Sequence, residues 1–252
     1  MSEAARLLPR HSEDGVLGGR LRLRQPTSGY RVAIDPVFLA AAVPAGPRDT
    51  VLDIGCGVGA AALCLAARVP GCRVTGIDVQ RDLISLAGDN IVLNELSARV
   101  SVMQGNLLDL PRRLAPGAFD HVMANPPYNE RGRAAPSAIP GKADATIEGD
   151  ADLGAWVRFS LAMVRSKGTV TFIHRADRID ALLGQIAGRA GEVVVFPLWA
   201  GQGRAASRVL VRARKQIAAP ARLAPGLVLH ESDGRFTAAA EAVLREGRGL
   251  EL

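Results

Sequence analysis

The chain has 252 residues, of which 48% are hydrophobic and 22% are charged, and its formal net charge is +6 at pH 7. This composition is typical of an ordinary soluble globule, and no apolar run approaches the roughly 18 residues of a membrane span. Since the N-terminus also lacks the apolar stretch of a secretory signal, we expect a cytoplasmic protein, and the positive charge is compatible with a polyanionic partner.

The predicted elements begin after residues 1–17, which show no sustained periodicity and are expected to form a loose lead-in. Residues 20–24 alternate arginine and leucine, which predicts a two-faced strand with the arginines on the solvent side. Residues 34–42 predict a short apolar helix, in which Asp35 is the N-cap and Pro36 the first helical residue.

From residue 50 the pattern becomes the alternation of strands and helices that is typical of a mostly parallel sheet. Apolar runs predict seven strands, at 51–54, 73–77, 99–103, 119–124, 169–174, 193–198 and 208–213. Helices are predicted at 60–69, 81–93, 152–165 and 176–189. We therefore expect an α/β fold with a seven-stranded, mostly parallel, Rossmann-like sheet and an antiparallel edge hairpin. This core would span 49–215, preceded by a lead-in, strand and helix segment at 1–48 and followed by a C-terminal extension at 216–252.

A glycine-rich sequence, DIGCGVG, begins at Asp53, where a predicted strand gives way to a helix. Gly55 and Gly57 would let the backbone turn sharply and approach a ligand. With Ala60 the loop also satisfies the dinucleotide pattern Gly-x-Gly-x-x-Ala, so the loop alone leaves both NAD and S-adenosylmethionine open. Asp53 favours S-adenosylmethionine, because a carboxylate at this position suits an ammonium or sulfonium group better than a pyrophosphate.

Two further positions follow strands at the same edge of the predicted sheet. Asp78 closes the second strand and is expected to accept both ribose hydroxyls of the cofactor, and Asn106 follows the third strand and could reach the adenine amine. The cysteines, Cys56, Cys64 and Cys72, fit neither a zinc site nor a disulfide framework. No His/Cys/carboxylate cluster is evident, so we expect no metal.

The tetrapeptide Asn125-Pro126-Pro127-Tyr128 follows the strand predicted at 119–124. Residues before proline avoid helical geometry, so an extended segment would hold the Asn125 side-chain oxygen and the Pro126 carbonyl in place. Two acceptors on the hydrogens of a conjugated amine favour the pyramidal form that attacks a methyl group. The aromatic ring of Tyr128 would stack on the substrate, a role that needs no hydroxyl. Asn-Pro alone also marks a turn, but the ligand-binding pattern on the same edge favours methyl transfer to a conjugated nitrogen.

The segment 129–150 is rich in Gly, Pro, Ala and charge and is too long for an idle connection, which predicts a substrate loop. Its cations Arg131, Arg133 and Lys142 could bind RNA phosphates or simply be solvated, and the sequence leaves both open. His174 ends a strand on the same edge, where a locally hydrogen-bonded histidine is favoured over a functional one.

These motifs resemble those of the class I S-adenosylmethionine-dependent methyltransferases, and the tetrapeptide is similar to the Asn-Pro-Pro-Tyr motif of their amino-methylating branch. Residues 25–35 and 208–237 look like segments of the bacterial tRNA(Val) adenine-N6 methyltransferase family. The resemblance implies the class I methyltransferase fold, S-adenosylmethionine as cofactor, and transfer to an exocyclic amino group in RNA, with adenine N6 in tRNA favoured. It also places Tyr30 beside the methionine end of the cofactor. Asn106 departs from the acidic residue that relatives more often have.

Three alternatives remain from the sequence. A protein glutamine N5-methyltransferase needs the same two acceptors, although such enzymes usually have a long N-terminal helical domain and only about fifty residues precede the glycine loop here. An rRNA guanine or DNA adenine amino-methyltransferase is the second, and no target-recognition region for DNA is evident. The third is a silent nucleotide-binding module, which the intact tetrapeptide argues against. The sequence does not indicate an oligomeric state.

Overall fold

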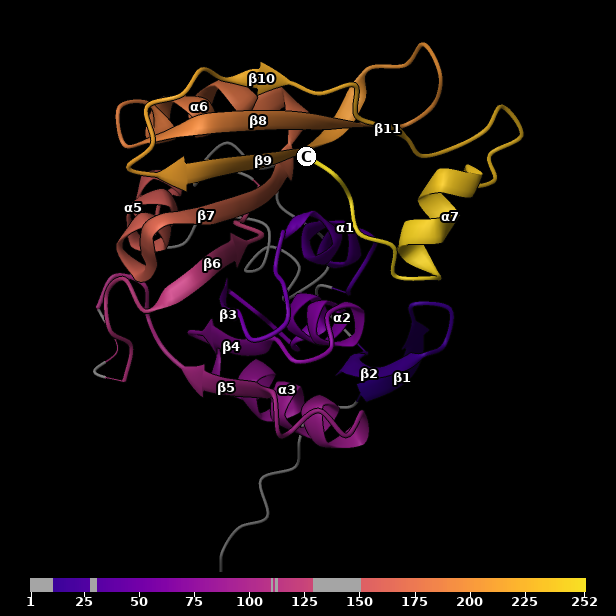
Figure 1. Ribbon diagram of the computed structural model, residues 1–252. Coiled ribbons are helices and arrows are strands. Elements are labelled where there is room, and N and C mark those ends of the chain that lie inside the picture. Colours follow the sequence, from indigo (N-terminus) through magenta and orange to yellow (C-terminus); the bar gives the residue numbers. More distant parts are fainter. Residues whose placement is uncertain (1–10, 28–30, 110, 112, 129–150) are drawn as a thin grey trace, which may run out of the picture.

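The computed structural model describes residues 11–27, 31–109, 111, 113–128 and 151–252. Its centre is a sheet to which nine strands of the described chain contribute (Figure 1). The strands are β3 (Thr50–Ile54), β4 (Arg73–Asp78), β5 (Val100–Gln104), β6 (Phe119–Ala124), β7 (Val164–Arg175), β8 (Ala190–Trp199), β9 (Ala206–Lys215), β10 (Arg222–Leu223) and β11 (Leu227–Val228). The spatial order is β10-β8-β9-β7-β6-β3-β4-β5, and β11 also pairs with β8.

The predicted fold class is confirmed. The strands β3 to β7 are parallel to one another, whereas β9 runs antiparallel to both of its neighbours, β7 and β8. The seven predicted strands are all present, and the two-residue strands β10 and β11 extend the sheet beyond β8.

Helices cover both faces of this sheet (Figure 1). They are α1 (Asp35–Ala42), α2 (Ala60–Arg68), α3 (Arg81–Leu93), α5 (Leu153–Met163), the 3-10 turn η1 (Ala176–Arg178), α6 (Ile179–Ile186) and α7 (Ala238–Leu244). The buried side chains form two clusters, one with α1, α2, α3 and α7 and the other with α5 and α6. Neighbouring residues of β3 illustrate the division, because Val51 joins the first cluster and Leu52 the second, as the two-residue period of a strand requires.

The prediction of a loose lead-in is wrong for part of residues 1–17. Strand β1 (His11–Val16) pairs antiparallel with β2 (Leu21–Pro26) as a separate hairpin, while residues 1–10 lie outside the described chain. The sequence of β1 lacks apolar alternation because its side chains form ion pairs instead. Glu13 contacts Arg22 at 3.3 Å and Arg24 at 3.2 Å, so the arginine face of β2 is partly neutralised by its own hairpin.

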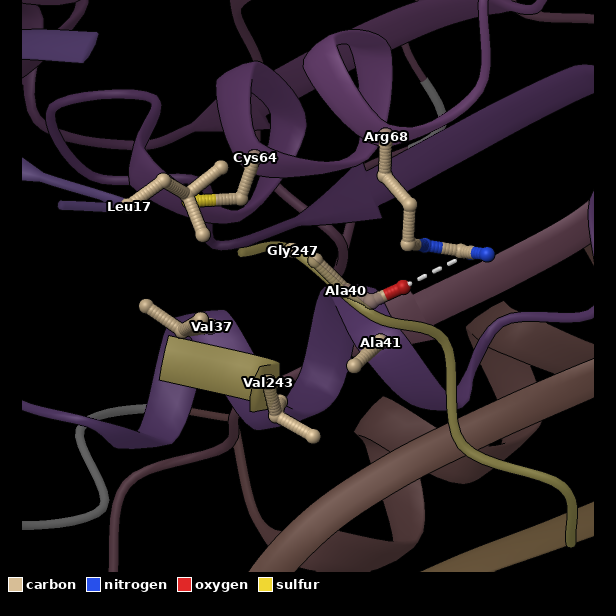
Figure 2. A pocket seen from close by; sticks show the side chains of 8 residues that line it. All are labelled: Leu17, Val37, Ala40, Ala41, Cys64, Arg68, Val243 and Gly247. Atoms are coloured by element: carbon tan, nitrogen blue, oxygen red, sulfur yellow. Dashed lines mark hydrogen bonds between the residues drawn. The ribbon is translucent and has the colours of Figure 1, made fainter. Parts of the chain in front are cut away.

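A small cavity lies where α1, α2 and α7 meet the hairpin (Figure 2). It is lined by Leu17, Val37, Ala40, Ala41, Cys64, Arg68, Val243 and Gly247. Arg68 donates from Nη2 to the carbonyls of Ala40 at 3.0 Å and Val43 at 2.5 Å, which ties the last residue of α2 to the carboxyl end of α1. None of the predicted site residues lines this cavity, so it belongs to the packing of the helices. None of the described helices has the length and apolar character that crossing a membrane requires.

Candidate active site

The glycine loop and the tetrapeptide lie next to each other at the carboxyl edge of the sheet. Ile54, the last residue of β3, pairs with Ala124, the last residue of β6. Gly55 and Asn125 are therefore the first residues after two adjacent parallel strands that end side by side. This is the edge at which open α/β sheets bind ligands.

The glycine loop needs glycine for two different reasons. Gly55 and Gly57 have φ values of 68° and 54°, in the left-handed region that other residues rarely adopt. A Cβ on Gly55 would lie 2.4 Å from the indole of Trp156, so α5 packs directly against the loop. A Cβ on Gly57 would meet none of the described atoms within 4 Å, and this part of the loop is open to an approaching ligand.

Asp53 is a buried carboxyl group with an incomplete environment. Its side chain is 2% exposed, and Oδ2 has no hydrogen-bond partner in the described part of the chain. Burial, reinforced by the negative charge of Asp78 and opposed by the backbone amide of Ala62, raises the pKa of Asp53 to about 8. A buried oxygen that lacks a partner is costly, so a cation or donor placed here would be favourable.

Asp78 is fixed by the loop that it faces. Its Oδ2 accepts from the amide of Gly57 at 2.9 Å, and its Oδ1 accepts from the amide of Gln80 at the same distance. Burial raises the pKa of this carboxyl, although the backbone amides work in the opposite direction. Each carboxylate oxygen retains a further lone pair, so the predicted contact with two ribose hydroxyls is compatible with this geometry and stays a prediction.

Asn106 and Gln104, at the end of the third strand, both make local hydrogen bonds. The Asn106 side-chain oxygen accepts from the amide of Leu108 at 2.9 Å, so it closes its own turn and has one remaining lone pair for an adenine amine. Gln104 donates to the carbonyl of Val79 at 3.0 Å. Val79 and Leu108, which no sequence motif singles out, are 58% and 51% exposed. Val79 directly follows Asp78 in the chain, so one of these exposed apolar side chains lies next to the carboxyl that is predicted to bind the ribose.

The tetrapeptide is held by residues from distant parts of the chain. The Tyr128 hydroxyl oxygen lies 2.6 Å from Asp35 Oδ2 and 2.8 Å from Asn125 Oδ1. Arg208 forms an ion pair with the same Asp35 oxygen at 3.1 Å, and its guanidinium carbon lies 4.7 Å from the centroid of the Tyr128 ring. The prediction that Asp35 caps α1 is wrong, because Ile34 is the N-cap and makes no side-chain capping bond. The Asp35 carboxylate faces the tetrapeptide instead.

His174, on β7, lies beside this group. Its ring centroid is 5.7 Å from that of Tyr128, the residue is 0% exposed, and neither ring nitrogen has a partner among the described residues. The favoured interpretation of a locally hydrogen-bonded histidine is therefore wrong. Burial, together with the positive charges of Arg178 and Arg208, lowers the pKa of His174 to about 4. The imidazole is neutral at pH 7. Arg178 also donates to the Tyr128 carbonyl at 3.1 Å.

The structure thus brings most of the predicted site to one edge of the sheet. The residues concerned are Asp53, Gly55, Gly57, Asp78, Asn106, Asn125, Pro126 and Tyr128. The remaining four, Tyr30, Arg131, Arg133 and Lys142, lie outside the described residues. In the described ranges, no group of three or more His, Cys, Asp and Glu side chains could hold a metal ion.

One family model matches the part of the chain that contains most of this site. Residues 30–141 match the model of the methyltransferase small domain, a range that includes the glycine loop, Asp78 and the tetrapeptide. This part of the chain is therefore similar to the methyltransferase small domain. The β1–β2 hairpin and strands β7 to β11 lie outside the matched range. The ion pair between Asp35 and Arg208 therefore connects the matched range, which contains Asp35, with a strand outside it, which contains Arg208.

Among curated relatives, the tRNA1(Val) (adenine(37)-N6)-methyltransferase of Vibrio campbellii is 33% identical over 105 residues, which are 42% of this chain and 43% of the relative. The release factor glutamine methyltransferase of Rhodopirellula baltica is 40% identical over 83 residues, or 32% of this chain and 27% of that protein. An rRNA N(6)-adenosine-methyltransferase of Caenorhabditis elegans is 24% identical over 170 residues, covering 68% of this chain and 72% of the relative. The chain spans less than half the length of the first two.

Similarity to solved structures covers more of the chain. The crystal structure of a predicted O-methyltransferase from Agrobacterium tumefaciens superposes with a TM-score of 0.72 and 24% identity, and covers 86% of this chain and 98% of that one. At this level of identity the similarity concerns the fold. The described chain has the fold of the class I methyltransferases.

Proposed function

We propose that the protein transfers a methyl group from S-adenosylmethionine to an exocyclic amino group of a base in RNA, with adenine N6 in tRNA as the substrate. The observation that carries the proposal is the position of two polar sites at the ends of adjacent strands. The orphan carboxyl of Asp53 lies on β3, and the acceptors of Asn125 and Pro126 directly follow β6. A cation and an amine held at these two places would be neighbours.

The residues around the glycine loop fit S-adenosylmethionine. Asp53 offers a buried acceptor to a positive group, Asp78 offers lone pairs to hydroxyl groups, and the open side of Gly57 lets the backbone approach the ligand. When bound, S-adenosylmethionine supplies an electrophilic methyl group on a sulfonium. The exposed side chains of Val79 and Leu108 would support its adenine ring.

The tetrapeptide would bind and orient the target amine. The Asn125 side-chain oxygen and the Pro126 carbonyl accept its two hydrogens, which favours a pyramidal nitrogen with a localised lone pair. These acceptors interact more strongly as the nitrogen gains positive charge, so they lower the barrier more than they stabilise the bound substrate. The Tyr128 ring holds the base by stacking. Metal ligands are not needed for this chemistry, which depends on placed dipoles.

Two kinds of support favour RNA over a protein substrate. The relatives from Vibrio campbellii and Caenorhabditis elegans are both named as RNA adenine-N6 methyltransferases, although the relative from Rhodopirellula baltica is named as a glutamine methyltransferase. The chain also has a formal net charge of +6, and Arg178 and Arg208 lie beside Tyr128. The loop cations Arg131, Arg133 and Lys142 are proposed to add phosphate contacts.

Methyl transfer from tritium-labelled S-adenosylmethionine separates the substrate classes. The parent protein should label bulk tRNA, and the Asn125→Ala variant serves as the control. Nucleoside analysis of tRNA from a deletion strain and its parent should then show the loss of one N6-methyladenosine. Label that enters only protein, or only rRNA or DNA, would contradict the proposal.

A further inference from the structure

The Tyr128 hydroxyl has two acceptors and only one proton. Its oxygen lies within hydrogen-bond distance of Asp35 Oδ2 at 2.6 Å and of Asn125 Oδ1 at 2.8 Å. A tyrosine hydroxyl can donate one hydrogen bond and accept others, so it cannot donate to both oxygens at once. One of the two short contacts would then join two oxygens without a proton between them.

The Asp35 carboxylate is the stronger of the two acceptors for the hydroxyl proton. Asp35 is 5% exposed and forms an ion pair with Arg208, whereas the amide oxygen of Asn125 is neutral. Hydrogen bonds to a charged group are shorter and about twice as strong as those between neutral groups. Burial opposes the charge on Arg208, but Asp35 and Tyr128 together outweigh it and leave the pKa of Arg208 raised. The hydroxyl proton therefore belongs to the Asp35 contact, and the hydroxyl oxygen faces Asn125 as an acceptor.

The orientation of the Asn125 amide follows from that assignment. The oxygen and nitrogen of an asparagine amide exchange places by rotation about the Cβ–Cγ bond, and the hydrogen-bond network selects between the two orientations. An acceptor at Tyr128 selects the orientation in which Nδ2 points to the hydroxyl. The amide oxygen then points away from Tyr128.

We propose that Asp35 and the Tyr128 hydroxyl are positioning groups that turn the Asn125 amide so that it offers its oxygen, and not its NH2 group, to the substrate amine. This inference rests on the proposed function, because an acceptor is required only if the substrate presents an amine. Without Asp35, the hydroxyl is free to donate to the Asn125 oxygen. Asn125 would then present a donor to the amine, and the reaction would lose its acceptor.

A double-mutant cycle in single-turnover methyl transfer tests this chain of contacts. Tyr128→Phe keeps the ring, so RNA affinity should stay within about twofold while the rate falls about tenfold, as expected for one hydrogen bond of about 1.4 kcal/mol. Asp35→Asn should cause a loss of similar size. In the Tyr128→Phe background, Asp35→Asn should add almost nothing, because both groups act through the same hydroxyl. Losses that multiply would overturn the proposal.

A second cycle does not require an Asp35 variant to fold. If the hydroxyl acts only through Asn125, then Tyr128→Phe should cost nothing further in the Asn125→Ala background, and a second tenfold loss there would contradict the inference. Asp120→Asn is a matched control, because Asp120 also forms an ion pair with an arginine, Arg165, at 2.6 Å, but is the second residue of β6 and so lies towards the opposite edge of the sheet. This variant should keep the rate of the parent.

Nuclear magnetic resonance of the ligand-free protein provides a measurement that is independent of activity. The side-chain NH2 signals of Asn125 are assigned by their loss in Asn125→Ala. If Nδ2 is turned towards Tyr128, these protons should show nuclear Overhauser effects to the Tyr128 ring protons nearest the hydroxyl. Absence of these effects would overturn the inference. A parent protein that methylates no RNA would contradict the proposed function instead, and this measurement would still decide the orientation of the amide.

Discussion

The two ends of the candidate site carry opposite electrostatics. At the glycine loop, two buried carboxyl groups, Asp53 and Asp78, lie close enough for the charge of Asp78 to raise the pKa of Asp53. At the tetrapeptide, the positive charges of Arg178 and Arg208 help to lower the pKa of His174. Burial is the largest cause in both cases, raising the pKa of Asp53 to about 8 and lowering the pKa of His174 to about 4, and these neighbouring charges act in the same direction as burial. Both groups are therefore neutral at pH 7. The neighbouring charges differ in sign, and we propose that the carboxyl groups at the glycine loop bind a cationic ligand whereas the arginines beside Tyr128 contact the phosphates of the RNA.

The largest predicted effect concerns stability at the tetrapeptide end. The pKa of His174 is about 4 in the folded protein and about 6.5 when unfolded, so between these values only the unfolded chain binds the proton. Stability is present above pH 6.5 and should be lost as the pH falls towards 4, by about 3 kcal/mol. Chemical denaturation at several pH values measures this, and His174→Leu should remove that part of the slope.

His11→Gln, which changes an exposed histidine on β1, is the control and should retain the slope of the parent. If the His174→Leu variant loses the same stability between pH 6.5 and 4 as the parent, the buried imidazole is not the cause. The lowered pKa of His174, which represents the tetrapeptide end in this comparison, would then be wrong.

The second prediction concerns Asp53, at the glycine-loop end of the site. A cationic ligand requires the ionised form of Asp53, whose pKa is about 8 in the free protein. Binding of S-adenosylmethionine should therefore release close to one proton at pH 7, and its affinity should fall by roughly tenfold for each pH unit below 8. Calorimetry in buffers of different ionisation enthalpy counts the protons. Asp53→Asn should release none, and a parent protein that also releases none would refute the role of Asp53.

A smaller effect is expected at Asp78. Asp78→Ala removes acceptors for the ribose hydroxyls, and hydrogen bonds to charged groups contribute about 1.5–3 kcal/mol each, so affinity for S-adenosylmethionine should fall by one to two orders of magnitude. Asp180→Ala, an exposed carboxylate on α6, should bind as the parent does. Unchanged affinity in Asp78→Ala, or tighter binding of NAD than of S-adenosylmethionine by the parent, would exclude the assignment.

The same contrast explains which parts could be predicted from the sequence. The glycine-loop end is local, because Asp53, Gly55, Gly57 and Asp78 lie at or just after the ends of two consecutive strands, and their backbone requirements appear as glycines and strand ends. The sheet itself was predictable from apolar runs separated by helices, and its class was confirmed.

The tetrapeptide end could not be predicted in the same way. Asp35 and Arg208 are 173 positions apart, and they meet only because β9 inserts antiparallel between β7 and β8. Asp35 precedes a proline, so its local sequence predicts a helix cap. Its carboxylate instead contacts Tyr128 and Arg208, and neither contact can be predicted from neighbouring residues. Strand β1 was missed because ion pairs from Glu13 replace the apolar alternation that identifies a strand.

The most direct test of the account compares Asn125→Ala with the parent in single-turnover methyl transfer at saturating S-adenosylmethionine, with titrations of cofactor and RNA in parallel. The account predicts a rate lower by roughly 10²–10³, the range found when one preorganised polar group at a reacting centre is removed. Cofactor affinity should hardly change, because the acidic end is intact. If Asn125→Ala transfers methyl groups at the parent's rate, the tetrapeptide only ends a strand and the proposed chemistry is wrong.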